Sequence, residues 1–215
     1  LQWIDDIKKG KANINDIILN KNLELIKIAF DHGMIPTKYS LQNAIKTRSI
    51  GIVNLVLTKN PAYNVNNISD AIKTNLLDIV KSVVKYVVKY HGKNSVSQDD
   101  VNVALENGNL EIIYFIEKNG GKYVSNLSVL YAIKSSKIEV IKYVLSKGVS
   151  YNEIEAIGFI QYRNTDVLKY MLSILQLIDI TAIQKILSAV ISSYNLPAIK
   201  IVMDHFDQRN DQIIN

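Results

Sequence analysis

The sequence has no cysteine, few arginines and no long apolar run. Without cysteine among its 215 residues, the chain can have no disulfide, no thiol nucleophile and no cysteine-based zinc site. The apolar stretch at residues 171–178 is only eight residues long, and the one at 83–88 is interrupted by Lys85. Both are far shorter than the roughly 20 residues that cross a membrane. We therefore expect no membrane contact and an intracellular, cytoplasmic location.

Sequence patterns that carry chemistry are also missing. No Gly-rich phosphate loop, nucleophile elbow or metal-ligand spacing occurs. The acid pairs Asp5-Asp6 and Asp99-Asp100 are adjacent in sequence, so their carboxylates point apart and suit helix starts. The three histidines are each expected at the end of a second helix, too far apart for one metal site: His32, His91 and His205. We predict no enzyme activity, no metal and no cofactor.

The charge balance is mildly basic. The net charge is +5 and the pI is about 9.1, with 48% hydrophobic residues, a composition typical of a folded chain. The basic residues are lysines spread along the chain, apart from three arginines: Arg48, Arg163 and Arg209. This balance allows an acidic partner but does not indicate nucleic acid, for which clustered arginines would be expected.

The chain repeats one phrase, which is clearest at Ala132–Gly148 and Ala104–Gly120. A small or apolar pair is followed by a polar gap, an acid, an apolar run and a glycine. Aligning on the first residue of the pair gives seven anchors: Ile17, Ala44, Ala71, Ala104, Ala132, Phe159 and Val190. The steps between them are 27, 27, 33, 28, 27 and 31 residues. A period in this range predicts a solenoid of helical units that bury their apolar faces against one another.

Within each unit, the apolar run has helical spacing. Val140, Ile141, Val144 and Leu145 form one stripe of a helix. An acid begins the run, where the helix dipole favours negative charge, and glycine ends several runs with the left-handed conformation of a C-terminal cap. The acids are Glu24, Asp78, Glu111, Glu139 and Asp166, and the glycines are Gly33, Gly92, Gly120 and Gly148. Each unit is therefore predicted to be two antiparallel helices and a turn.

The third unit and the two ends differ from this pattern. Residues 77–92 contain four extra residues, close to one helical turn, so we expect a longer second helix with its apolar stripe in phase. Residues 1–12 are predicted to be a partial, capping unit, and residues 207–215 the end of the array. We expect one continuous array over 1–215.

The string Ala104-Leu-Glu-Asn-Gly-Asn-Leu-Glu111-Ile-Ile, followed by glycine, resembles an ankyrin repeat. The degenerate, Lys- and Tyr-rich variant is similar to ankyrin arrays of giant DNA viruses. The family's Thr-Pro-Leu-His opening is absent from every unit, and the period is about six residues shorter than the usual 33 or so. The resemblance therefore implies an all-α ankyrin-like solenoid of about seven units, with shortened or absent β-hairpins.

In ankyrin repeats the two positions after the anchor pair face the concave side. By resemblance, the partner-binding residues are Lys46, Thr47, Lys73, Thr74, Glu106, Asn107, Lys134, Ser135, Gln161 and Tyr162, with Ser192 and Ser193 in the last unit. Three lysines with one acid among them favour an acidic or polar protein surface as the ligand. We expect a non-enzymatic scaffold that binds a host or viral protein. A helical-repeat nucleic-acid binder and a structural component of a virion are the alternatives, the latter through an apolar patch at 171–178.

Overall fold

The computed structural model describes residues 2–62, 64, 66–122, 126–149, 164–174, 180–192 and 194–214. These residues form fourteen α-helices and one short 3-10 helix, and none of them is in a strand. The all-α prediction is thus confirmed. The chain divides into two compact units, Leu1–Lys122 and Tyr123–Asn215. The continuous array over 1–215 stays a prediction.

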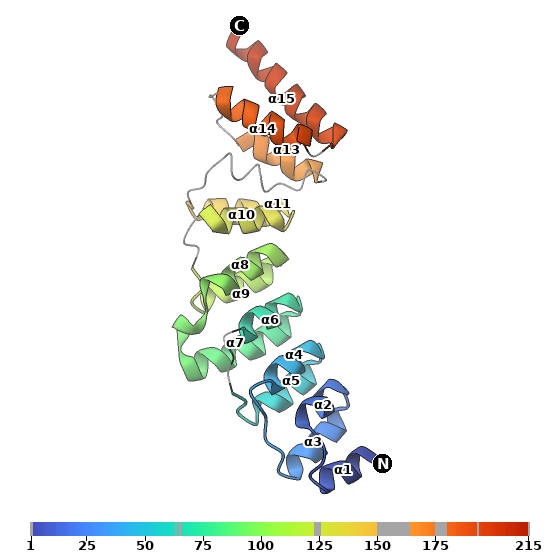
Figure 1. Ribbon diagram of the computed structural model, residues 1–215. Helices are drawn as coiled ribbons and strands as arrows, with labels where there is room; N and C mark the ends of the chain where they lie inside the picture. The colour runs from blue at the N-terminus through green and yellow to red at the C-terminus, as the bar shows by residue number, and fades with distance from the viewer. Residues whose placement is uncertain are drawn as a thin grey trace. The chain divides into compact units, whose positions relative to one another are not determined.

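The first unit consists of short helices that pack in two rows (Figure 1). One row, in order of packing, is α2 (Ile14–Leu19), α4 (Ser40–Lys46), α6 (Asn67–Lys73) and α8 (Gln98–Asn107). The other is α1 (Gln2–Lys8), α3 (Leu23–Asp31), α5 (Ile50–Leu57), α7 (Leu77–His91) and α9 (Leu110–Lys118). The 3-10 helix η1 (Lys93–Ser95) follows α7. Successive helices from the two rows, such as α4 and α5, also pack together as pairs.

The core of the first unit is built from the positions that the sequence pattern marked. The anchors are at most 1% exposed: Ile17, Ala44, Ala71 and Ala104. Equivalent apolar residues of the second row are buried to the same degree: Ile26, Val53, Val80 and Ile113. Because an alanine at the anchor leaves room for a neighbouring helix, each pair can bury its apolar stripes against the next pair.

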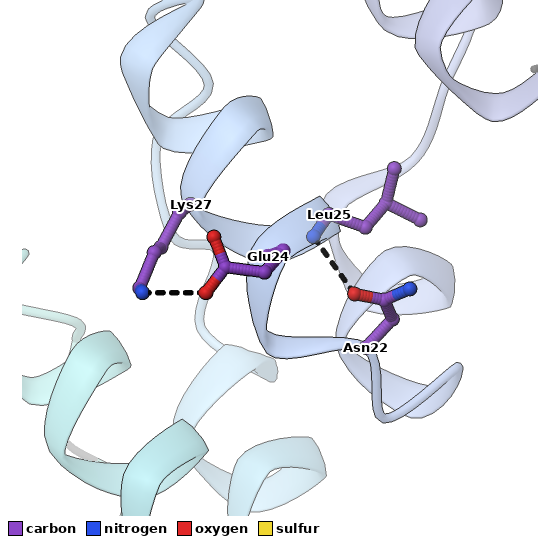
Figure 2. Close-up of polar contacts among 4 residues, drawn as sticks. All are labelled: Asn22, Glu24, Leu25 and Lys27. Atoms are coloured by element: carbon purple, nitrogen blue, oxygen red, sulfur yellow. Dashed lines mark hydrogen bonds and ion pairs between the residues drawn. The ribbon is translucent and has the colours of Figure 1, made fainter.

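The helix ends follow their predicted chemistry. At the start of α3, Asn22 Oδ1 accepts a hydrogen bond from the backbone N–H of Leu25 at 3.0 Å, and Glu24 lies in the first turn (Figure 2). Glu24 also forms an ion pair with Lys27 at 2.7 Å. At the other end, Gly33 has a φ of +83°, the left-handed conformation of a glycine cap.

Helix α7 is longer than its neighbours, as predicted. It has 15 residues, against 8 in α5 and 9 in α9. Its buried side chains keep one stripe through the extra turn: Ile79, Val80, Val83, Val84 and Val87. Two tyrosines of the extended part reach the chain before α6. Tyr86 donates to the Pro61 carbonyl at 2.8 Å, and Tyr90 donates to Asn60 Oδ1 at 3.3 Å.

The second unit contains α10 (Asn126–Lys134), α11 (Ile138–Ser146), α13 (Thr165–Ile174), α14 (Ile180–Ser192) and α15 (Leu196–Ile214). The anchors Ala132 and Val190 are fully buried, whereas Phe159 lies outside the described residues. Helix α15 continues through residue 207, where the predicted end segment begins. Met171 and Leu172, considered for an exposed apolar patch, are buried; residues 175–178 of that stretch lie outside the described residues.

Candidate functional site

One tight turn recurs between the two helices of the pairs. Its central residue has a left-handed backbone at Lys21, Arg48, Asn75 and Gly108 in the first unit, with φ of 65°, 60°, 56° and 71°. In the second unit, Ser136 and Tyr194 have φ of 57° and 52°. Within the first unit these residues are 27, 27 and 33 positions apart, the same steps as the anchors. The predicted partner-binding residues that the structure describes lie at this turn, so its geometry determines which of them are accessible.

The predicted hydroxyl residues hold the turn together. Thr47 and Thr74 are each only 6% exposed. Thr47 Oγ1 donates to the Ala44 carbonyl at 2.6 Å and accepts from the Ser49 N–H at 3.2 Å. Thr74 makes the same two bonds with Ala71 and Leu76, and Ser135 makes them with Ala132 and Lys137. Thr47 and Thr74 therefore cap their helices and have little surface to offer a partner.

Asn107 links two helix pairs. Its Nδ2 donates to the Ile72 carbonyl near the end of α6, at 2.5 Å. The neighbouring Asn109 donates to Asn75 Oδ1 at 2.9 Å, so two amides join the turn after α8 to the turn after α6. Since Asn107 is half-buried and already hydrogen-bonded, its position is explained by packing between the pairs.

The charged members of the predicted site are accessible. Lys46, Lys73 and Glu106 are exposed, each two residues after its anchor. The equivalent residue of the first pair is Leu19, which is 45% exposed. We call Leu19, Lys46, Lys73 and Glu106 the turn row. In the second unit, Lys134 is half-buried with its Nζ 4.6 Å from the centre of the Tyr131 ring. Gln161 and Tyr162 lie outside the described residues, as does Ser193.

A shallow depression of about 250 Å³ lies between the ends of α4 and α6. It is lined by Ile45, Lys46, Arg48, Asp70, Lys73 and Thr74. Asp70 accepts a hydrogen bond from Gln42 Nε2 at 2.9 Å. Among the described residues, no acid lies within ion-pair distance of Lys46, Arg48 or Lys73. With three cations and one carboxylate, the depression has a formal charge of +2 and can attract an anion.

The basic residues are spread along the chain, as the sequence analysis stated, but the acids are scarce in the part of the sequence that contains this depression. Residues 32–98 contain nine Lys or Arg and only two acids, Asp70 and Asp78, a formal charge of +7. The other 148 residues contain sixteen Lys or Arg and eighteen acids, a formal charge of −2. The helix pairs α4–α5 and α6–α7 therefore form the basic part of the protein.

The histidines agree only in part with their prediction. His32 follows α3, with its Nδ1 2.9 Å from the Ile28 carbonyl oxygen, and His91 is the last residue of α7. His205 instead lies within α15, because that helix continues to Ile214. In the part of the chain that the structure describes, no three His, Asp or Glu side chains are grouped so that they could hold a metal ion.

The fold and the charged turn row define an all-α protein with a basic surface depression. Compared with models of protein families and with curated proteins, the chain matched no family model and no curated protein. Across the described residues, every helix is too short or too polar to span a lipid bilayer.

Proposed function

We propose that the chain is a non-enzymatic scaffold, an ankyrin-like array of helix pairs that binds a protein partner through the face carrying the turn row. The observation that carries the proposal is the group of Lys46, Arg48 and Lys73 around the depression. All three are exposed, and none has an acidic partner in the part of the chain that the structure describes. Unpaired cations on a rigid surface favour an acidic protein surface, because they lose no internal ion pair on binding.

The ankyrin-like part of the proposal is supported by the packing of short helices in two rows. It is also supported by the left-handed turn residue that recurs at the anchor period of 27 residues. Stacked helix pairs of this kind form extended surfaces with side chains held in place by the helices beneath them. We extend this interpretation to a viral or host protein as the partner, as the resemblance implies.

A nucleic-acid partner is the second candidate, and the charge of +7 over residues 32–98 favours it. Two features of the turn row count against it. The row begins at the exposed apolar Leu19 and ends at the exposed Glu106, so a continuous polyanion along the row would meet an apolar side chain and a like charge. The protein partner is the better fit.

The test is affinity capture from lysate of cells in which the natural protein functions, with and without nuclease. The variant Lys46→Glu/Lys73→Glu reverses two charges of the turn row. Its matched control, Lys85→Glu/Lys93→Glu, makes the same change of net charge at exposed residues outside the depression. We expect the first variant to recover specific proteins at least about tenfold less well than wild type, and the control to recover them normally.

Two outcomes would contradict the proposal. Equal losses in both variants would show that only net charge matters. Recovery that disappears after nuclease treatment would instead establish nucleic acid as the ligand, and circular dichroism of each variant checks that it remains folded.

A further inference from the structure

Arg48 occupies the left-handed position of the turn after α4. Its φ of 60° is in the left-handed region, where a side chain is disfavoured by about 1 kcal/mol or more and glycine is preferred. Lys21, Asn75 and Gly108 occupy the equivalent turns of the other pairs in the first unit, so the turn accepts several residue types. Among the described residues, the Arg48 side chain has no hydrogen-bond partner and no acid within ion-pair distance. Contacts with the described residues therefore do not explain why this turn has an arginine.

The depression provides an explanation. Lys46 and Lys73 are the last residues of α4 and α6, where the helix dipole favours a cation whether or not a ligand binds. Arg48 lies beyond the end of α4, yet it lines the same depression as the two lysines. A guanidinium can donate two parallel hydrogen bonds to a carboxylate, which a lysine cannot do.

We propose that Arg48, with Lys46 and Lys73, forms a subsite for the carboxylate side chains of an acidic peptide segment. This inference rests on the proposed function and specifies the partner. The segment crosses the turn row, with an apolar residue at Leu19, one acidic residue at Lys46 and Arg48, a second acidic residue at Lys73, and a basic residue at Glu106.

The spacing of the helices sets the spacing of these residues in the peptide. Packed helices lie about 10 Å apart, and an extended chain advances about 3.3 Å per residue. Successive recognition residues are therefore about three positions apart, in the order apolar, acidic, acidic, basic. The change of sign at Glu106 distinguishes this ligand from a nucleic acid, whose charge does not change along the strand.

The probe is a fluorescein-labelled peptide of about twelve residues, with Leu, Glu, Glu and Lys at every third position and Ser or Gly elsewhere. It is made in this order and in the reverse order, because either chain direction is compatible with the row. A peptide of the same composition with Lys moved between the two Glu residues is the sequence control. A single-stranded oligonucleotide of about twelve nucleotides is the polyanion control. Binding is followed by fluorescence anisotropy at low salt.

The key variant is Arg48→Gly, and its matched control is Lys21→Gly. Lys21 is an exposed cation at the same turn of the first pair, with a φ of 65°, and it lies outside the depression. Both variants replace a left-handed charged residue with glycine, so both should melt about 2–4 °C higher than wild type. We expect one peptide order to bind more tightly than its sequence control, Arg48→Gly to weaken that binding about two- to fivefold, and Lys21→Gly to leave it unchanged.

Three results would overturn the inference. The first is that neither peptide order binds better than the sequence control. The second is that Arg48→Gly and Lys21→Gly have equal affinities. The third is that the oligonucleotide binds more tightly than the peptides and loses affinity in Arg48→Gly. If captured proteins are lost in Lys46→Glu/Lys73→Glu but retained by Arg48→Gly, the proposed function stands and the Arg48 subsite does not.

Discussion

The helix pairs α4–α5 and α8–α9 contain turns with the same backbone conformation, but the exposed side chains beside the two turns carry charges of opposite sign. Arg48 and Gly108 are both left-handed, and the residues two positions before them are Lys46 and Glu106. The core beneath is the same, since Ala44 and Ala104 are buried anchors in both pairs. The turn thus fixes the backbone, while the exposed positions around it can change sign without altering the fold. In the binding that we propose, the residues that contact the partner therefore differ from those of the same segment that stabilise the fold.

The two pairs also differ at the start of their first helix. Ser40 in α4 and Asp100 in α8 are both fully buried, and each accepts the backbone N–H of the residue three positions earlier, at 2.9 Å. Each also forms a hydrogen bond with a neighbouring helix pair. The Ser40 hydroxyl donates to Asn15 Oδ1 at 3.0 Å, and Asp100 accepts a hydrogen bond from Ser69 Oγ at 2.6 Å. Asp100 accepts a further bond from the hydroxyl of Ser97 at 2.8 Å.

The largest change in stability is expected for substitutions of these two buried residues. Asp100→Ala removes a buried acceptor of three hydrogen bonds and should lower the free energy of unfolding by about 3 kcal/mol. Ser40→Ala removes a neutral hydroxyl and should cost only about 1 kcal/mol. Urea unfolding followed by circular dichroism measures both. Equal costs would show that the charge of Asp100 adds nothing to the cap.

A smaller effect of opposite sign is expected at the turn itself. Gly108→Ala places a β-carbon at a φ of 71° and should destabilise the protein by about 1–2 kcal/mol. Arg48→Gly, at the same turn of α4–α5, should stabilise it for the same reason. The melting temperatures of the two variants test this expectation. If both melting temperatures change in the same direction, the two turns are not equivalent in solution.

The pair between these two, α6–α7, differs from both in the length of its second helix. The smallest change in stability is expected for a substitution in this helix. Tyr86→Phe removes the hydrogen bond to the Pro61 carbonyl and should cost about 1 kcal/mol or less at neutral pH. Burial, and then the neighbouring Tyr90, raise the pKa of Tyr86 above its ordinary value of 10.0. The folded state therefore disfavours the tyrosinate.

The raised pKa of Tyr86 determines how its contribution to stability changes with pH. Because the folded pKa is the higher one, the contribution of Tyr86 to stability is complete below about pH 10 and is lost as the pH rises through the folded value. Burial raises the pKa of Tyr170 in the second unit in the same direction. Urea midpoints between about pH 8 and pH 11 should fall less steeply for Tyr86→Phe than for wild type. If the urea midpoints of the two proteins fall equally steeply with pH, Tyr86 does not contribute to the pH dependence of stability.

The features predicted from sequence are those set by apolar spacing and by residue type. The buried anchors, the acid at the start of α3, Gly33 at its end and the extra turn of α7 all follow from periodicity and capping. The left-handed turn was missed because Lys, Arg, Asn, Ser and Tyr share no preference for it; only their recurrence at the anchor period could have revealed it. Thr47 was predicted to face a partner, but its hydroxyl satisfies a helix-end carbonyl and is buried.

The side-chain hydrogen bonds that join one helix pair to the next have a kinetic consequence. Asn15 to Thr37, Ser69 to Asp100 and Asn107 to Ile72 connect residues only 22, 31 and 35 positions apart. Because these loops are short, closing them costs little chain entropy, and proteins dominated by such local contacts fold quickly. If the first unit is the repeat array that we propose, its folding can begin at any helix pair and spread to the pairs on either side. Under a pulling force it should yield one pair at a time, as a series of small extensions rather than a single rupture.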